Sequence, residues 1–190
     1  MIRKPSKEQV EEIVNLHLAS LRDGVLYQLG KKVLSIFYEE IINDKNSFIL
    51  VYEMGASVIG VAASTKDADK IFKNIIKKHL LKISFNILQK SIKYPFLPLR
   101  LLFSKNSNKL KPELLFLFVE PSQRGRRIGE KLVDATSNEI KKMGIRQYKI
   151  MILSSNNRGI RFYEKIGFIK IDQYKYLGEY RDIYKYDIKL

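Results

Sequence analysis

A short basic loop between a strand and a helix is the part of this sequence best suited to chemistry. An apolar run over residues 114–119 predicts a buried strand, which Pro121 ends. The loop then reads Arg124-Gly125-Arg126-Arg127-Ile128-Gly129, and apolar residues recur after it at helical spacing. In such a turn successive backbone N–H groups point inward, and the helix N-terminus adds a partial positive charge. The pattern therefore predicts an anion cradle that binds a phosphorylated small molecule.

Helices and strands on both sides must hold this loop in place. Hydrophobic spacing predicts helices over 6–20, 33–42 and 68–93, a long helix that ends near 143, and a short helix over 159–166. The predicted strands cover 47–53, 57–63, 114–119, 147–153, 169–177 and 182–190. The sequence shows no internal repeat and no low-complexity linker.

Composition limits the class of protein. A chain of 190 residues with 45% hydrophobic content is long enough for one domain with a real core. It has no cysteine, so neither disulfide bonds nor thiolate metal sites are expected. No apolar run approaches the roughly 20 residues that span a bilayer, and the N-terminus shows no signal-peptide pattern. We therefore expect a soluble, cytoplasmic protein.

The net charge of +15 is concentrated in one segment. Residues 66–111 contain twelve lysines and arginines but only Asp67 and Asp69 as acids. Within that segment the predicted helix 68–93 is basic and amphipathic. The excess indicates an anionic partner or surface nearby, although a solvated face of lysines explains it equally well.

Two motifs, taken in this order of elements, resemble the GNAT superfamily of acyl-CoA-dependent N-acyltransferases. The loop 124–129 is similar to that family's Gln/Arg-x-x-Gly-x-Gly/Ala pyrophosphate loop, except that Arg127 stands where glycine is usual. We expect Arg127 to adopt helical backbone angles and still donate its N–H. The second motif, residues 156–168, looks like Asn-x-x-Ala-x-x-Phe/Leu-Tyr-x-Lys-x-Gly-Phe, with Gly159 replacing the alanine.

The resemblance implies a fold, a cosubstrate and a set of contacts. The fold would be α/β (α+β): a mixed, mostly antiparallel sheet flanked by helices, in a single domain 1–190 with a basic helical insertion at 66–111. The cosubstrate would be acetyl-CoA, its pantetheine arm lying between two splayed strands. The residues expected to contact it are Leu117, Phe118, Val119, Arg124, Gly125, Arg126, Arg127, Ile128, Gly129, Asn156 and Tyr163.

The resemblance also suggests catalytic roles. Tyr163 would protonate the departing thiolate, because a phenol with a pKa near 10 keeps its proton at neutral pH. The N–H of Val119 would stabilise the oxyanion. Glu113 and Glu120 are the carboxylates available as a general base, and a surface or capping role competes for each. Asn156 could instead cap a helix. No metal site is expected, since the two histidines, His17 and His79, are far apart in the sequence.

The acceptor stays open. We expect acetyl transfer to a primary amine of a small molecule, which could be an amino sugar nucleotide. Acceptor specificity is expected from residues 21–29, 94–113 and 174–184. Acetylation of a protein N-terminus or lysine is the alternative enzyme reading. The alternative from another functional class is a non-catalytic module that binds CoA. The basic helix 68–93 could pack within the protein, form a homodimer contact, lie on a membrane surface or, less in keeping with its composition, follow nucleic acid.

Overall fold

The structure is a computed structural model that describes residues 1–22, 25–91, 109–176 and 179–189. Its helical elements are η1 (Lys7–Gln9), α1 (Val10–Ser20), α2 (Val25–Leu29), α3 (Lys31–Asn43), α4 (Ala68–Lys78), α5 (Leu80–Ser91), η2 (Pro121–Gln123), α7 (Ile128–Lys142) and α8 (Asn157–Lys165). Its strands are β1 (Ile2–Arg3), β2 (Ser47–Met54), β3 (Ser57–Thr65), β4 (Glu113–Val119), β5 (Gln147–Leu153), β6 (Ile169–Tyr176) and β7 (Glu179–Asp187).

The strands form one sheet in the order β1-β2-β3-β4-β5-β7-β6. Neighbouring strands are antiparallel except β4 and β5, which are parallel and pair only at the start of β4. The two-residue strand β1 escapes sequence prediction because it is too short to show alternation. The predicted mixed, mostly antiparallel sheet flanked by helices is confirmed.

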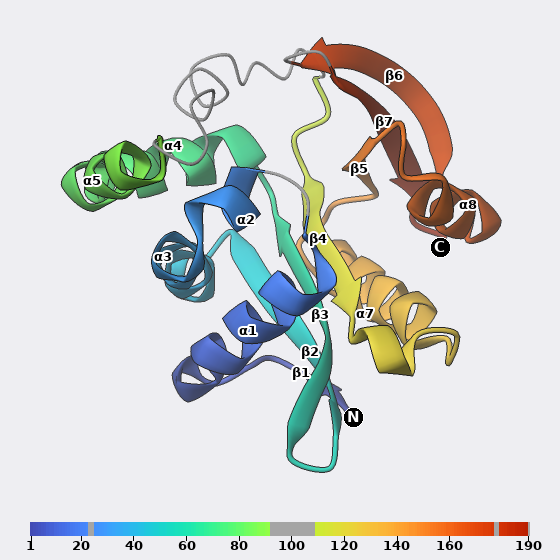
Figure 1. Cartoon of the computed structure of the whole chain (residues 1–190). Helices are drawn as coiled ribbons and strands as arrows, with labels where there is room; N and C mark the ends of the chain where they lie inside the picture. The colour runs from blue at the N-terminus through green and yellow to red at the C-terminus, as the bar shows by residue number, and fades with distance from the viewer. Residues whose placement is uncertain (23–24, 92–108, 177–178, 190) are drawn as a thin grey trace.

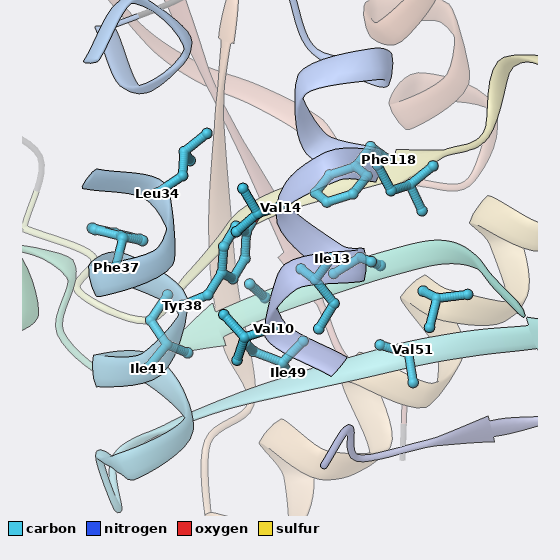
Figure 2. Close-up of a cluster of buried hydrophobic side chains, with 14 of the residues drawn as sticks. Val10, Ile13, Val14, Leu34, Phe37, Tyr38, Ile41, Ile49, Val51 and Phe118 are labelled. Atoms are coloured by element: carbon cyan, nitrogen blue, oxygen red, sulfur yellow. The ribbon is translucent and has the colours of Figure 1, made fainter. Parts of the chain in front are cut away.

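One face of the sheet is covered by α1 and α3 (Figure 1). Their apolar stripes meet the inward side chains of β2 and β4, as the close-up of this core in Figure 2 shows. Tyr38 and His17 are fully buried within it, and the His17 Nδ1 lies 2.6 Å from the Tyr38 hydroxyl. The ring of His17 also meets Phe116 and Phe118 edge-on, so this core supports β4 from behind.

The opposite face is covered by α7, with α8 beside it (Figure 1). The first turns of α7 approach β3 closely at Gly60, where a Cβ would lie 3.0 Å from side-chain atoms of Ile128 and Leu132. The loop before α7 is thereby held at the end of β4.

The segment between β3 and β4 contains α4 and α5 rather than the single helix predicted for 68–93. The pattern of lysines and isoleucines runs through His79 without a glycine or proline, so no residue type marks the break. In the structure His79 leaves helical geometry at φ −117° and ψ 25°, and its Nε2 lies 2.9 Å from a Glu40 carboxylate oxygen. Ile71, Ile75 and Ile83 are buried in the first core. The remainder of the insertion, residues 92–108, lies outside the described residues.

Candidate active site

The edge of β4 that faces β5 is open beyond its first residue. Within the residues described for these two strands, they pair only through Glu113 and Lys149, where the Lys149 amide donates to the Pro112 carbonyl at 2.9 Å. On the other edge, the amide of Glu120 donates to the Ile59 carbonyl of β3 at 2.9 Å. Amides alternate in direction along a strand, so those of the alternate residues Leu117 and Val119 point toward β5.

This open edge can bind an extended ligand that carries amide groups. Leu117 and Val119 offer backbone N–H groups that β5 does not use, and such a ligand would add itself as a strand. The expected oxyanion donor, the N–H of Val119, is one of them. Phe118 differs from the expectation: it is paired with Val61 of β3, and its ring is buried against His17. Its backbone therefore does not face the opening.

A bulge bends β4 in the middle of this edge. Ala63 pairs with Phe116 and Ser64 pairs with Leu114, so Leu115 is an extra residue. The Ser64 hydroxyl donates to the Glu113 carbonyl at 2.8 Å beside it. Bulges re-aim a strand and its side chains, and this one separates the closed start of β4 from its open end.

The predicted cradle follows β4 through η2. Gly125 has φ 85° with no atom within 4 Å of its missing Cβ, and Arg127 caps α7 at φ 56° and ψ 17°. The expectation of helical angles at Arg127 is wrong, because this residue adopts the left-handed conformation that the family's usual glycine reaches without strain. The first amides of α7, at Ile128 and Gly129, have no intrahelical acceptor. They are available to an anion.

Arginines surround the cradle, but not all are free to bind. Arg124 donates from Nε to the Val119 carbonyl and from a terminal nitrogen to the Ser20 carbonyl, each at 3.2 Å, so it fastens the end of β4 to the end of α1. Arg126 and Arg127 are exposed. Burial lowers the pKa of Arg124 from its usual value, and the nearby charge of Arg158 adds to this effect. Two like charges held together at the opening favour an anionic ligand.

Arg158 is a candidate that the sequence analysis did not select. It lies in the first turn of α8, inside the second motif, so its sequence position could have suggested it. Asn156 precedes it as the helix cap, and its side chain accepts from the Gly159 amide at 2.9 Å. The capping role of Asn156 is therefore confirmed, which leaves its amide nitrogen for a ligand. At Gly159 a Cβ would lie 2.5 Å from the terminal methyl of Ile152, so here that methyl fills the space of the family's alanine.

Tyr163 lies on α8 against the second core. Its ring meets Phe162 and Phe168 edge-on, each with ring centroids 5.1 Å apart, and the side chain is half-buried. Burial raises the pKa of Tyr163 above its ordinary value. Its hydroxyl has no hydrogen-bond partner among the described residues. A phenol that keeps its proton and has no partner fits the expected proton donor.

Glu113 and Lys149 form a buried pair at the closed end of the β4–β5 opening. Both side chains are 3% exposed, and the Lys149 Nζ lies 3.8 Å from a Glu113 carboxylate oxygen, which is too long for a hydrogen bond. That oxygen, Oε2, has no hydrogen-bond partner in the described part of the chain. Burial raises the pKa of Glu113 to about 7, and the charge of Lys149 opposes the rise. Such a carboxylate is suited to take a proton at neutral pH.

The structure separates the two candidate bases. Glu120 lies at the other end of β4, half-exposed, where its carbonyl accepts the Gln123 amide beside the cradle. Among the described residues no cluster of three or more metal-ligating side chains exists, and no helix of that part of the chain could span a membrane.

The region of this chain that matches a known protein family contains both motifs. Residues 100–170 match the model of a family described as an acetyltransferase (GNAT) domain. Over these residues the chain resembles a GNAT acetyltransferase domain. This confirms the expected superfamily and, with it, the expected enzyme class, an acyltransferase. No curated protein matches the sequence.

Solved structures show that the similarity in fold extends over nearly the whole chain. PaiA N-acetyltransferase from Thermoplasma acidophilum, in complex with coenzyme A, is 18% identical with a TM-score of 0.61 and 98% of both chains covered. YncA of Salmonella typhimurium, described as a putative acetyltransferase and solved with acetyl-CoA, is 14% identical with a TM-score of 0.60, covering 100% of this chain and 94% of its own. The ribosomal-protein-S18-alanine N-acetyltransferase of Escherichia coli is 12% identical with a TM-score of 0.64, covering 100% and 94%.

Structures of this fold thus hold coenzyme A or acetyl-CoA, so the prediction of acetyl-CoA as cosubstrate is confirmed at the level of the family. The acceptor is not fixed by these comparisons. Part of each segment expected to select it, residues 23–24, 92–108 and 177–178, lies outside the described residues.

Proposed function

We propose that this protein transfers an acetyl group from acetyl-CoA to a primary amine of a small molecule by direct attack. The observation that carries the proposal is the parting of β4 from β5 immediately after Glu113 and Lys149, with the glycine-and-arginine cradle at the open end. One strand edge can then hold the pantetheine arm, and the cradle can hold the diphosphate. The thioester would come to lie along the bulged part of β4.

The residues can divide the reaction as follows. The amine nitrogen attacks the thioester carbonyl and a C–N bond forms, while the N–H of Val119 donates to the developing oxyanion. The proton that the nitrogen loses goes to Glu113, directly or through a water. The C–S bond then breaks, and the phenol of Tyr163 gives its proton to the thiolate. Glu113 thus ends with one proton more and Tyr163 with one proton fewer, and proton exchange with solvent restores both residues.

Charge supports a small, anionic acceptor. Lys149 is buried beside Glu113 at the closed end of the β4–β5 opening, and the insertion that joins β3 to β4 is strongly basic. An amino sugar nucleotide would satisfy both the amine requirement and this charge. The second enzymatic reading, acetylation of a protein, draws on the fold shared with the ribosomal-protein enzyme, at 12% identity.

A thiol-release screen tests the proposal. Acetyl-CoA is mixed with the protein and with amino sugars, amino sugar nucleotides, polyamines, amino acids or peptides, and free CoA thiol is followed over time. We expect release that depends on a small amine. Release with peptides alone would favour the protein acetyltransferase. Binding of acetyl-CoA without acceptor-dependent release on any amine would contradict the proposal and favour the silent CoA-binding module.

A further inference from the structure

The helix α5 is apolar on two opposite faces. Ile83 and Asn86 are buried, and Ile87 packs beside the first core. On the other side of the helix, Leu81 is 85% exposed, Phe85 63% and Leu88 70%. These three residues follow the i, i+4, i+7 spacing of one helical face. Large apolar side chains gathered on an outward face mark an interaction surface.

Exposed apolar residues continue onto the neighbouring helix. Ile76 near the end of α4 and Leu80 at the start of α5 are also about half exposed. With Leu81, Phe85 and Leu88 they form what we name the outer apolar face. In Figure 1, α4 and α5 lie at the side of the molecule away from α7 and α8.

Lysines border the outer apolar face. Lys73 lies one turn before Ile76, and Lys82 lies one turn before Phe85, with Lys77 beside Ile76; all three are exposed. None of them has an acidic partner among the described residues, whereas Lys78 turns back to Glu40 at 2.8 Å. Over residues 68–91 the only acid is Asp69, against six lysines. The face is therefore apolar at its centre and positive at its border.

We propose that the outer apolar face lies on an anionic lipid surface, with Leu81, Phe85 and Leu88 in the headgroup–acyl boundary and the lysines on the lipid phosphates. This is the residue distribution of an interfacial helix. No helix of the described chain could span a bilayer, so the contact is peripheral. The proposal is independent of the acetyl acceptor.

Charge argues against the other occupants. A second copy of the chain packed by two-fold symmetry would place the same patch against itself, and the unpaired lysines of both copies would repel each other. Nucleic acid would pair with the lysines, but it would press its polar backbone against three leucine and phenylalanine side chains. An anionic bilayer satisfies both parts of the surface.

Vesicle flotation tests the proposal with the full chain. The vesicles contain either phosphatidylcholine alone or phosphatidylcholine with phosphatidylglycerol, each at low and high salt. The apolar variant is Leu81→Gln/Phe85→Gln/Leu88→Gln, and the lysine variant is Lys73→Gln/Lys77→Gln/Lys82→Gln. The matched control has the same charge change at exposed lysines elsewhere, Lys32→Gln/Lys45→Gln/Lys141→Gln. Circular dichroism verifies that each variant is folded.

We expect flotation with the anionic vesicles that weakens with salt. The lysine variant should partition into the anionic vesicles roughly a hundredfold more weakly than wild type. The apolar variant should partition at least about tenfold more weakly, and the control should lose much less than the lysine variant. No flotation, or equal loss in the lysine variant and the control, would overturn the proposal. So would a dimer in sedimentation that the apolar variant abolishes, or binding to duplex RNA in preference to the vesicles that only the lysine variant weakens.

Discussion

The buried pair of Glu113 and Lys149 allows a prediction about the pH dependence of the reaction. Glu113 has a pKa of about 7 because burial disfavours its charge, and Lys149 opposes this from 3.8 Å. We expect kcat/KM to rise with pH around 7 as Glu113 loses its proton. Glu113→Gln should remove that rise and lower turnover at pH 8 by about 10²–10⁴-fold, the usual contribution of a general base.

The size of the effect of Lys149 follows from the distance. Two unit charges 3.8 Å apart interact by about 4 kcal/mol at an effective dielectric constant near 20. Because 1.36 kcal/mol corresponds to one pH unit, Lys149→Met should move the midpoint of the rise upward by roughly one to three pH units. Water that enters the vacated space screens the remaining charge, so we expect a shift toward the lower end of this range.

The assay is initial-rate thiol release from pH 5 to 10 with one amine. Titration of the amine itself is the same for all proteins, so the comparison among variants isolates Glu113. Lys185→Met is the matched control, because Lys185 is the cross-strand partner of Lys149 on β7 but is paired with Asp187. An unchanged midpoint in Lys149→Met, or a pH profile for Glu113→Gln that follows wild type, would refute the assignment.

Three further predictions concern other residues. Arg127→Gly should be more stable than Arg127→Ala by about 1 kcal/mol in urea unfolding, because only glycine relieves the left-handed strain at φ 56°; equal stabilities would contradict that conformation. Tyr163→Phe should lower turnover by about 10²–10⁴-fold with unchanged acetyl-CoA affinity by calorimetry, and normal turnover would remove its acid role. Burial lowers the pKa of His17 to about 4 in the folded protein, whereas the unfolded chain keeps the ordinary pKa of about 6.5. The contribution of His17 to the free energy of unfolding is therefore complete above pH 6.5 and falls by about 1.4 kcal/mol per pH unit down to pH 4. The raised pKa of Glu113 gives a pH dependence of opposite sign, so the test is made in the Glu113→Gln background. Adding His17→Gln there should flatten the slope of unfolding free energy against pH between about 4 and 6.5. An unaltered slope would show that His17 is not its source.

Much of the local geometry of the candidate site was predictable from the sequence because local patterns encode it. The cradle is read from a strand, two glycines and a helix start, and the cap of α8 from Asn156. The features that escaped prediction depend on tertiary contacts. The break at His79 accompanies a bond to Glu40, and Arg124 is held by carbonyls of β4 and α1 rather than left for phosphate. The left-handed backbone of Arg127 is imposed by its surroundings, since arginine has no preference for it.

The burial of Glu113 was equally hidden from the sequence. Its position before an apolar run is also that of an ordinary surface residue. In the folded chain its side chain is only 3% exposed and lies beside Lys149 of the neighbouring strand β5. Sequence reasoning could therefore name two carboxylates, and the fold buries Glu113 and leaves Glu120 half-exposed.

Binding of acetyl-CoA to two aspartate variants tests the central claim most directly. Gly125 and Gly144 have φ 85° and 75°, and neither has an atom within 4 Å of its missing Cβ, so Gly125→Asp and Gly144→Asp impose the same kind of strain. Only the first puts a negative charge in the cradle; the second lies beyond the other end of α7. By titration calorimetry we expect the affinity of Gly125→Asp to fall about 10- to 100-fold, or about 1.4 to 2.8 kcal/mol, while Gly144→Asp binds like wild type. Wild-type affinity in Gly125→Asp would contradict the placement of the diphosphate at the end of β4.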